Sequence, residues 1–295
     1  MTELHQLASA GWICLTFLCM VVTMIPALES MSEHGKLLSG SGGTAIWWQR
    51  LSVPKRLFAH FYVAGFVFVT MVVAWHSPQA RACLLPTQHS PASMNTGTCR
   101  LKSDVLVVAL LFQAHLARRV CECLYVHRWG RARMHAAAYA VGIAHYALAA
   151  FTLAVELPAG ADSKQVTSHK DTPVGIIIAQ LAGVLLFLAA NAGQNAAHRH
   201  LASLKPDTRA GTDTASYRIP TAGLFSEVSC PHYFWEIALY ASFVMITGGQ
   251  VCSVVLMLVW VITNLSINAA HMHAWYWSHL KDYPVRRRRL VPFLW

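Results

Sequence analysis

The sequence of 295 residues has few charged side chains: 12% are Asp, Glu, Lys or Arg, whereas 55% are hydrophobic. A soluble domain carries roughly 25% charged residues, so this chain has too few to cover a surface that faces water. The shortage indicates that lipid is the main solvent around the folded chain. It also makes nucleic acid a poor partner, because the basic residues stand between apolar segments rather than on one soluble face.

The sequence also lacks the patterns of a disulfide scaffold and of a structural zinc site. Eight cysteines do not staple a chain of this length, and no paired Cys-x-x-Cys and His spacing occurs. We therefore expect no bound metal. Cys83 and Cys99 share one loop, and a disulfide between them requires that the loop face an oxidising lumen. The other six cysteines lie in or beside apolar segments, where we expect small buried thiols.

Seven apolar stretches account for most of the chain, with no internal repeat and no second soluble domain between them. A membrane helix needs about 20 mostly apolar residues to cross a hydrocarbon core of about 30 Å. The sixth stretch is shorter, which predicts a tilted helix or an extension through Pro231 and His232. We expect one all-α membrane domain over residues 1–295 with seven transmembrane helices. Their expected ranges are Leu7–Leu28, Leu57–Trp75, Asp104–Val126, Met134–Leu157, Val174–Asn195, Tyr233–Thr247 and Val251–Ala270.

Lys and Arg are distributed unevenly between the two sides of these spans. Sixteen fall on one side and five on the other, and Arg118 and Arg119 lie within the third span. The positive-inside rule predicts a cytosolic C-terminus and an N-terminus outside the cell or in a lumen. The net charge of +10 suits cytosolic loops that face anionic lipid, or a polyanionic ligand such as a phosphorylated cofactor. The run Arg286–Arg289 is weak evidence by itself, because it also fixes topology.

Polar residues interrupt three spans, and within each span they share one helix face. Ionisable groups in hydrocarbon cost several kcal/mol unless they face a polar interior, so three such faces near the cytosolic ends predict a hydrophilic pocket open to the cytosol. Two alternatives stay open: Arg118 and Glu122 as a structural pair, and amides that only hold helices together. The three sets are His115, Arg118, Arg119 and Glu122; Asn191, Gln194, Asn195 and His198; and Asn264, Asn268 and His271, followed by His273 and Tyr276.

Three C-terminal segments resemble the steroid 5α-reductase family, in the family's order. They are YRIPTAGLF at 217–225, SCPHYFWE at 229–236 and DYPVRRRRLVPFLW at 282–295. Upstream, VPKRLFAHFY at 53–62 and ARRVCECLYV at 117–126 are similar to the polyprenol/polyprenal reductase branch. The resemblance implies a bundle of seven membrane helices that holds NADPH in a cavity open to the cytosol. Residues 1–130 would form the more variable, substrate-side part and residues 131–295 the NADPH-binding part.

By the same resemblance, ten residues are expected to contact NADPH. Arginine and lysine suit its phosphates, while amides and a carboxylate suit the ribose hydroxyls and the nicotinamide carboxamide. Steroid reductases have Asn where this chain has His232, and Asn and Asp where it has Gln194 and His198. The expected contacts are Arg119, Gln194, His198, Lys205, Tyr217, Arg218, His232, Glu236, Tyr276 and Tyr283.

Three residues are candidates for catalysis. His273 and Tyr276 share a helix face at i, i+3, and either can donate to a carbonyl oxygen or hold the nicotinamide. The alternative for His273 is a histidine at a helix end bonded to a carbonyl or a phosphate. Glu122 is the third candidate, acting through Arg119. The residues that polarise the carbonyl in steroid reductases appear here as Ser52 and Leu116, which argues against a steroid substrate.

The implied reaction is reduction of a conjugated C=C bond. The β carbon receives hydride while a donor hydrogen-bonds the carbonyl oxygen, where charge develops. Polyprenol has no carbonyl, so the long-chain isoprenoid polyprenal is the expected substrate and dolichal the product. Dolichol carries sugars for N-glycosylation, which implies the endoplasmic reticulum membrane, and we infer no obligate protein partner. The alternatives are a 3-oxo-steroid or other enone-lipid reductase, an isoprenylcysteine-type methyltransferase that uses S-adenosylmethionine, and a non-catalytic scaffold or transporter.

Overall fold

The structure is a computed structural model of the chain. It describes residues 2–25, 51–84, 96–130, 132–157, 174–205 and 218–295, with side chains outside 77–84 and 96–103. The predicted contact Tyr217 and the side chains of Cys83 and Cys99 lie outside the described residues. Seven long helices fill the described part, and each coincides with one of the apolar stretches. They are α1 (Thr2–Met24), α3 (Phe58–Leu84), α4 (Thr96–Cys121), α5 (Ala136–Glu156), α6 (Val174–Ser203), α7 (Pro231–Ile246) and α8 (Cys252–His279).

Five of these helices are long and apolar enough to cross a membrane, namely α1, α3, α5, α6 and α8. The chain is therefore a mostly helical, multi-pass membrane protein. Helix α7 has only 16 residues, and α4 contains Lys102, Asp104, Arg118 and Arg119. These two helices do not meet the same length and composition limits, so the expectation of seven spans is confirmed only in part.

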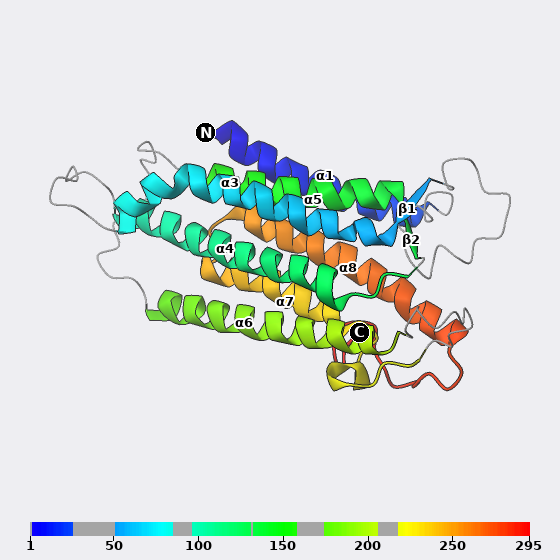
Figure 1. Cartoon of the computed structure of the whole chain (residues 1–295). Helices are drawn as coiled ribbons and strands as arrows, with labels where there is room; N and C mark the ends of the chain where they lie inside the picture. Colours follow the sequence, from blue (N-terminus) through cyan, green and yellow to red (C-terminus); the bar gives the residue numbers. More distant parts are fainter. Residues whose placement is uncertain (1, 26–50, 85–95, 131, 158–173, 206–217) are drawn as a thin grey trace.

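The helices lie side by side in one bundle (Figure 1). Helix α3 packs against α4 and α5, α6 against α7, and α1 against α8 and α5. Large apolar side chains from every part of the bundle fill its centre, with Trp12, Phe112, Tyr240 and Phe243 fully buried. Many of the exposed side chains of the helices are also large and apolar, for example Phe17, Leu181 and Leu185, as expected for a surface that contacts lipid.

Several helix ends differ from the sequence expectation. Helix α7 begins at Pro231, so the predicted extension of the sixth span is correct; proline at the first helical position is favourable because its missing N–H would be unbonded there anyway. Helix α6 continues to Ser203 instead of ending at Asn195, and α8 continues to His279 instead of Ala270. Both extensions are polar, so hydropathy alone ends too early although the backbone stays helical.

The end of the bundle that carries the short strands also carries the C-terminal segment (Figure 1). Strands β1 (Ser52–Pro54) and β2 (Arg133–His135) pair antiparallel there. The last turn of α4 is π-helical over Glu122–Val126 (η4), and a 3₁₀ turn, η3 (Lys55–Leu57), leads into α3. Single π turns inside helices often accompany functional sites.

A cap of mostly irregular structure closes this end of the bundle. It consists of residues 218–230, with the short helix η6 (Gly223–Ser226), and of residues 280–295. The Ser229 amide donates to the Arg288 carbonyl at 2.9 Å, and the Arg288 amide donates to the Glu227 carbonyl at 2.8 Å. Asp282 adopts a left-handed φ of 65°, a conformation that Asp tolerates better than most residues. It turns the chain back toward α8.

Candidate active site

A buried carboxylate at the end of α4 is the centre of the first polar cluster. Glu122 is 2% exposed and accepts hydrogen bonds from Arg118 and Arg119. The i, i+3 and i, i+4 spacings place all three side chains on one face of the last turn. Arg119 is 4% exposed, so most of this charge is removed from solvent and must be balanced within the helices.

Helix α6 completes the cluster from the opposite side. Asn195 donates to Glu122 Oε1 at 2.6 Å, and Asn191 Oδ1 accepts from Arg118 Nε at 2.9 Å. Gln194 accepts from Arg118 through its oxygen and donates through its nitrogen to Glu236 of α7. Two of the three polar faces predicted from the sequence, those of α4 and α6, therefore meet directly.

A histidine and a tyrosine bind the outer side of Arg119. His198 Nδ1 lies 2.8 Å from Glu122 Oε2 and 2.6 Å from Arg119 Nη1. Nδ1 donates to the carboxylate when it carries a proton and accepts from the guanidinium when it does not. Arg119 Nη2 donates to the Tyr62 hydroxyl at 2.6 Å, and its guanidinium carbon lies 4.5 Å from the centre of that ring. Tyr62 was missed from the sequence, although it ends the VPKRLFAHFY stretch.

We call Arg118, Arg119, Glu122, Gln194, His198 and Glu236 the ion-pair cluster. It contains two guanidinium groups and two carboxyl groups, so its formal charges balance when both carboxyls are ionised. His115 is fully buried beside it, and its Nε2 lies 3.8 Å from Glu236 Oε1, beyond hydrogen-bond distance. Removing one partner of a buried ion pair costs about 3–5 kcal/mol, because the remaining charge is left unpaired.

A second group joins α8 to the cap, and we call it the C-terminal cluster: Ser229, His273, Tyr276, Tyr283 and Arg287. Ser229 Oγ lies 2.6 Å from His273 Nδ1 and 2.7 Å from the Tyr283 hydroxyl. The Tyr276 and Tyr283 rings stack with centroids 5.3 Å apart and an interplanar angle of 11°. Burial raises the pKa of the Tyr283 phenol, so it stays neutral and can donate or accept. Ser229 was not predicted, although it begins the SCPHYFWE segment.

Arg287 is the least expected member of this cluster. It is 5% exposed, and within the described part of the chain its Nε and Nη1 have no hydrogen-bond partner. Its guanidinium carbon lies 5.2 Å from the centre of the Tyr283 ring. Arg286 beside it is exposed, so the basic run contains one buried arginine among residues that face water. Buried donors without acceptors need an explanation, and an anion supplies one.

His232, in the first turn of α7, lies between the two clusters. Its ring centroid is 5.7 Å from that of His198 in the ion-pair cluster and 4.2 Å from that of Tyr233. Tyr233 in turn packs among the apolar residues beneath the C-terminal tail, around Cys230 and Leu290. The predicted contacts from α6, α7 and α8 are thus brought to the same end of the bundle.

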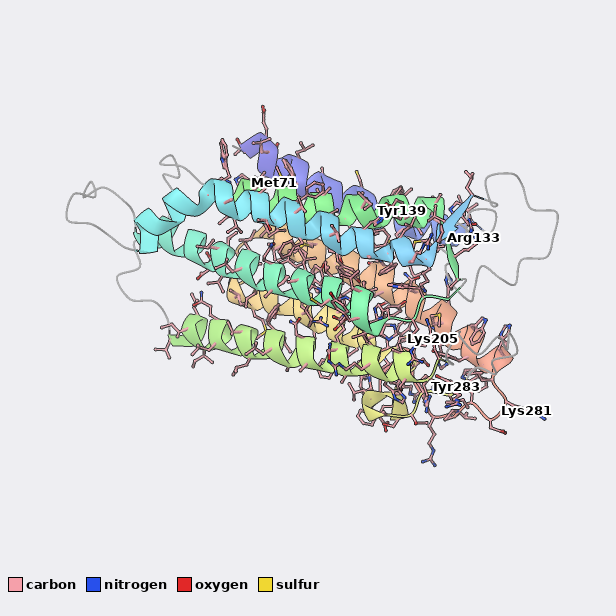
Figure 2. All side chains as sticks on the ribbon, in the orientation of Figure 1. Met71, Arg133, Tyr139, Lys205, Lys281 and Tyr283 are labelled. Atoms are coloured by element: carbon pink, nitrogen blue, oxygen red, sulfur yellow. The ribbon has the colours of Figure 1, made fainter. Side chains whose placement is uncertain are left out.

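Besides His232, the predicted cofactor contacts Lys205 and Arg218 lie outside both clusters. Lys205 Nζ donates to the Arg128 carbonyl at 2.5 Å, and Arg128 Nη1 donates to the Lys205 carbonyl at 3.0 Å. This reciprocal pair joins the end of α6 to the segment after α4. Arg218 is exposed at the start of the cap. Figure 2 shows Lys205, Arg133 and Lys281 at the same end of the bundle as Tyr283.

The third predicted face, on α8, is divided. Asn268 Nδ2 donates to the Asn264 carbonyl at 2.8 Å, and Asn264 Oδ1 lies 3.8 Å from the Cys19 thiol of α1. His273 lies nine residues after Asn264, roughly 13 Å farther along the helix axis, and belongs to the C-terminal cluster. The expectation of three faces around one pocket was therefore too simple: the amides of α8 bond to each other and to α1.

One set of side chains has the spacing of metal ligands. Ligand atoms of Glu122, His127 and His198 lie within 4.8 Å of one another. Burial, together with nearby Arg119, lowers the pKa of His127 to about 4, so this imidazole is neutral. The Glu122 carboxylate, however, already accepts from two guanidinium groups. A cation there would have to displace those groups or bear their repulsion, and we assign no metal to the site.

A bundle of apolar helices that buries charged groups near one end defines a multi-pass membrane protein with a polar site between its helices. Residues 163–295 match the family model described as 3-oxo-5-alpha-steroid 4-dehydrogenase. This part of the chain is therefore similar to that family, and the resemblance predicted from the C-terminal motifs is confirmed. It contains α6, α7, α8 and the whole C-terminal cluster.

Similar proteins extend the comparison to almost the whole chain. The polyprenal reductase of Caenorhabditis elegans is 29% identical over 292 residues, which cover 95% of this chain and 91% of that protein. Polyprenal reductase 1 of Oryza sativa subsp. indica is 27% identical over 99% of this chain and 98% of its own length. Polyprenal reductase 1 of Arabidopsis thaliana is 27% identical over 99% of both. The similarity therefore continues upstream of residue 163.

Proposed function

We propose that this protein is an NADPH-dependent polyprenal reductase, which reduces the α,β double bond of polyprenal to give dolichal. It is thus an oxidoreductase that acts on a CH–CH pair. The observation that carries the proposal is the similarity to polyprenal reductases over 95–99% of the chain. The family match of residues 163–295 supports the same reaction class, because the 4-dehydrogenase named there acts on the same kind of bond.

The packing of the bundle supports a specific arrangement in the membrane. We place all seven long helices across the membrane, because α4 and α7 pack within the bundle and link helices that are themselves candidate spans. A helix of 16 residues is about 24 Å long, close to the hydrocarbon thickness when Thr247 and the residues around it are included. The basic end then faces the cytosol and the N-terminus the lumen of the endoplasmic reticulum, where dolichol is used in N-glycosylation.

The two clusters fit a phosphorylated dinucleotide. Two buried nitrogens of Arg287 lack acceptors in the described structure, as does Arg119 Nε, and phosphate oxygens are suitable acceptors for arginine. Gln194 and Glu236 offer an amide and a carboxyl group suited to a nicotinamide carboxamide or a ribose. Arg287 and Tyr283 would hold the phosphates of the dinucleotide. His232 and His198 would contact the part between the phosphates and the nicotinamide. When bound, NADPH supplies the hydride.

The hydrogen bonds favour supporting roles for two of the three predicted catalytic residues. Glu122 accepts from Arg118, Arg119 and Asn195, so its oxygens are engaged and it anchors the arginines instead of moving a proton. His273 bonds to Ser229, which bonds to Tyr283, so it orients the cap. Tyr276 stacks on Tyr283 and completes the same wall of the cofactor site. Lys205 and Arg218 lie at the entrance to this site.

The substrate must carry a carbonyl group conjugated with the double bond. Hydride addition to the β carbon places negative charge on the carbonyl oxygen, and hydrogen-bond donors in the site stabilise that charge. The alcohol polyprenol offers no such oxygen. The isoprenoid tail is apolar and suits the lipid-facing surfaces between the helices, so only the aldehyde end has to enter the polar end of the bundle.

The test is product analysis with the purified full-length protein in lipid. Polyprenal, polyprenol and a 3-keto-Δ4 steroid are incubated separately with NADPH, and a fourth sample measures S-adenosylmethionine binding. We expect dolichal from polyprenal and little product from the other two. Faster turnover of the steroid would favour the activity after which the family model is described. Reduction of polyprenol at the same rate without any aldehyde formed would overturn the mechanism.

A further inference from the structure

Tyr146 of α5 is a mostly buried residue whose hydroxyl makes no hydrogen bond within the described residues and keeps some accessible surface. The residue is 6% exposed. Two neighbouring tyrosines differ in this respect. The Tyr62 hydroxyl accepts from Arg119 at 2.6 Å, and the Tyr240 hydroxyl lies 2.9 Å from His145 Nε2. Most hydroxyls inside native proteins are bonded, so an accessible and unbonded oxygen at this position is available to a ligand.

The tautomer of His145 shows how the Tyr240 hydroxyl is bonded. Trp260 Nε1, which can only donate, bonds to His145 Nδ1 at 3.0 Å. His145 therefore carries its proton on Nε2 and donates it to the Tyr240 oxygen. Tyr62 and Tyr240 thus have their oxygens fixed by protein donors. The Tyr146 hydroxyl bonds to neither Arg119 nor His145. Both its lone pairs and its proton are therefore left for a ligand.

The Tyr146 ring is held firmly in place. It lies 5.5 Å from the Tyr62 ring at 64° and 6.3 Å from the Phe112 ring at 16°. A Cβ atom at Gly65 of α3 would lie 2.8 Å from Tyr146 Cδ1 and 3.2 Å from Leu116 Cδ2. The ring therefore fits against a glycine where no larger residue has room, and such packing fixes the position of the hydroxyl.

Tyr146 lies at the boundary between the apolar bundle and the ion-pair cluster. On one side its ring contacts Phe112, which is fully buried in the apolar core. On the other side it contacts Tyr62, whose hydroxyl binds Arg119. An aldehyde on a long apolar chain needs this kind of boundary, because its tail stays among apolar side chains while its oxygen reaches a donor beside the cofactor.

We propose that Tyr146 is the catalytic residue that donates a hydrogen bond to the aldehyde oxygen of the substrate. This inference rests on the proposed function. The β carbon receives hydride from the reduced nicotinamide, which becomes oxidised, and the electron pair of the double bond moves toward the oxygen. The Tyr146 hydroxyl stabilises the charge that develops there. A proton from water then bonds to the α carbon, which restores the aldehyde and leaves the chain saturated.

The experiment compares Tyr146→Phe with Tyr139→Phe in the full-length protein. Tyr139 stands two turns earlier on the same helix and its hydroxyl lies 3.0 Å from His60 Nδ1, so the control removes one phenol hydroxyl from α5 away from the site. We expect Tyr146→Phe to reduce kcat on polyprenal by about 10²-fold or more, as for loss of one donor to a developing oxyanion. The Kd for NADPH should stay within a few-fold of wild type in both variants, and kcat should be kept in Tyr139→Phe.

The outcomes are distinct. An active wild-type protein with an equally active Tyr146→Phe variant overturns the inference, and so does a joint loss of kcat and NADPH binding, which indicates a structural role. A wild-type protein that does not reduce polyprenal overturns the proposed function instead. If Tyr146→Phe fails to fold, 3-fluorotyrosine at position 146 keeps the shape and makes the phenol more acidic. In a plot of kcat against pH, we then expect the alkaline limb of the fluorinated protein to lie at lower pH than that of the wild type. An alkaline limb at the wild-type pH contradicts the role of Tyr146.

Discussion

Replacing Arg287 with alanine should remove NADPH binding while leaving the bundle folded. The side chain is buried, and two of its nitrogens have no acceptor in the described structure. A hydrogen bond to a charged group contributes about 1.5–3 kcal/mol, so two of them to phosphate oxygens amount to roughly 3–6 kcal/mol. At 1.4 kcal/mol for each factor of ten, the Kd for NADPH should rise about 10²- to 10⁴-fold.

The effect on the folded protein without cofactor should be much smaller. In the free state, Arg287 loses its interactions with Tyr283, namely the contact between its guanidinium and the ring and a side-chain hydrogen bond. A cation–π contact contributes about 0.5–2 kcal/mol, and a hydrogen bond about 0.5–1.5 kcal/mol. A ligand at 100 times its Kd stabilises the native state by about 2.7 kcal/mol. Saturating NADPH should therefore raise the Tm of the wild type and leave that of Arg287→Ala nearly unchanged.

Arg286→Ala is the matched control. It removes the same charge from the same basic run, but Arg286 is exposed. Binding isotherms and thermal unfolding with and without NADPH, both in lipid, measure the two variants side by side. Equal loss of affinity in the two variants would mean that the run acts by its total charge. Wild-type affinity in Arg287→Ala would remove the C-terminal cluster from the phosphate site.

Three further predictions concern the rest of the site and the topology. Glu122→Gln should lower the stability of the folded protein by about 3–5 kcal/mol, because the buried Arg119 and the half-buried Arg118 lose their counter-charge; a loss of kcat at unchanged Tm would instead support a catalytic role. His273→Ala should raise the KM for NADPH with kcat nearly kept, and a 10²-fold fall in kcat alone would identify it as a proton donor. A tag at the C-terminus should be digested by protease added to sealed microsomes, and protection of that tag would reverse the orientation.

Much of the fold could be predicted because hydropathy and helical periodicity act locally. The seven apolar stretches coincide with the seven long helices, and Pro231 at the start of α7 follows from the rules for helix ends. The same periodicity placed His115, Arg118, Arg119 and Glu122 on one face. The helix that this face contacts could not be predicted, because spacing within a helix does not say which neighbouring helix it meets.

The parts that could not be predicted depend on contacts between distant segments. Asn264 and Asn268 have the spacing of a polar face, but whether they bond to α1 or to a cofactor depends on helix rotation. Arg287 cannot be distinguished from Arg286 by sequence, because only its packing against the Tyr283 ring sets it apart from its neighbours in the run. Ser229 and Tyr62 stand in the recognised stretches, yet their bonding partners lie 44 and 57 positions away.

The pairing of Arg288 with Glu227 and Ser229 also has a consequence for biogenesis. The last of the seven long helices ends at His279, so every helix of the bundle precedes the Arg288 segment in the order of synthesis. The cap cannot close until Arg288 has emerged, because both of its backbone bonds cross from one late segment to the other. A premature stop codon shortly after α8 is thus expected to yield a protein that keeps all seven helices and the ion-pair cluster but lacks Tyr283 and Arg287, the proposed phosphate side of the cofactor site.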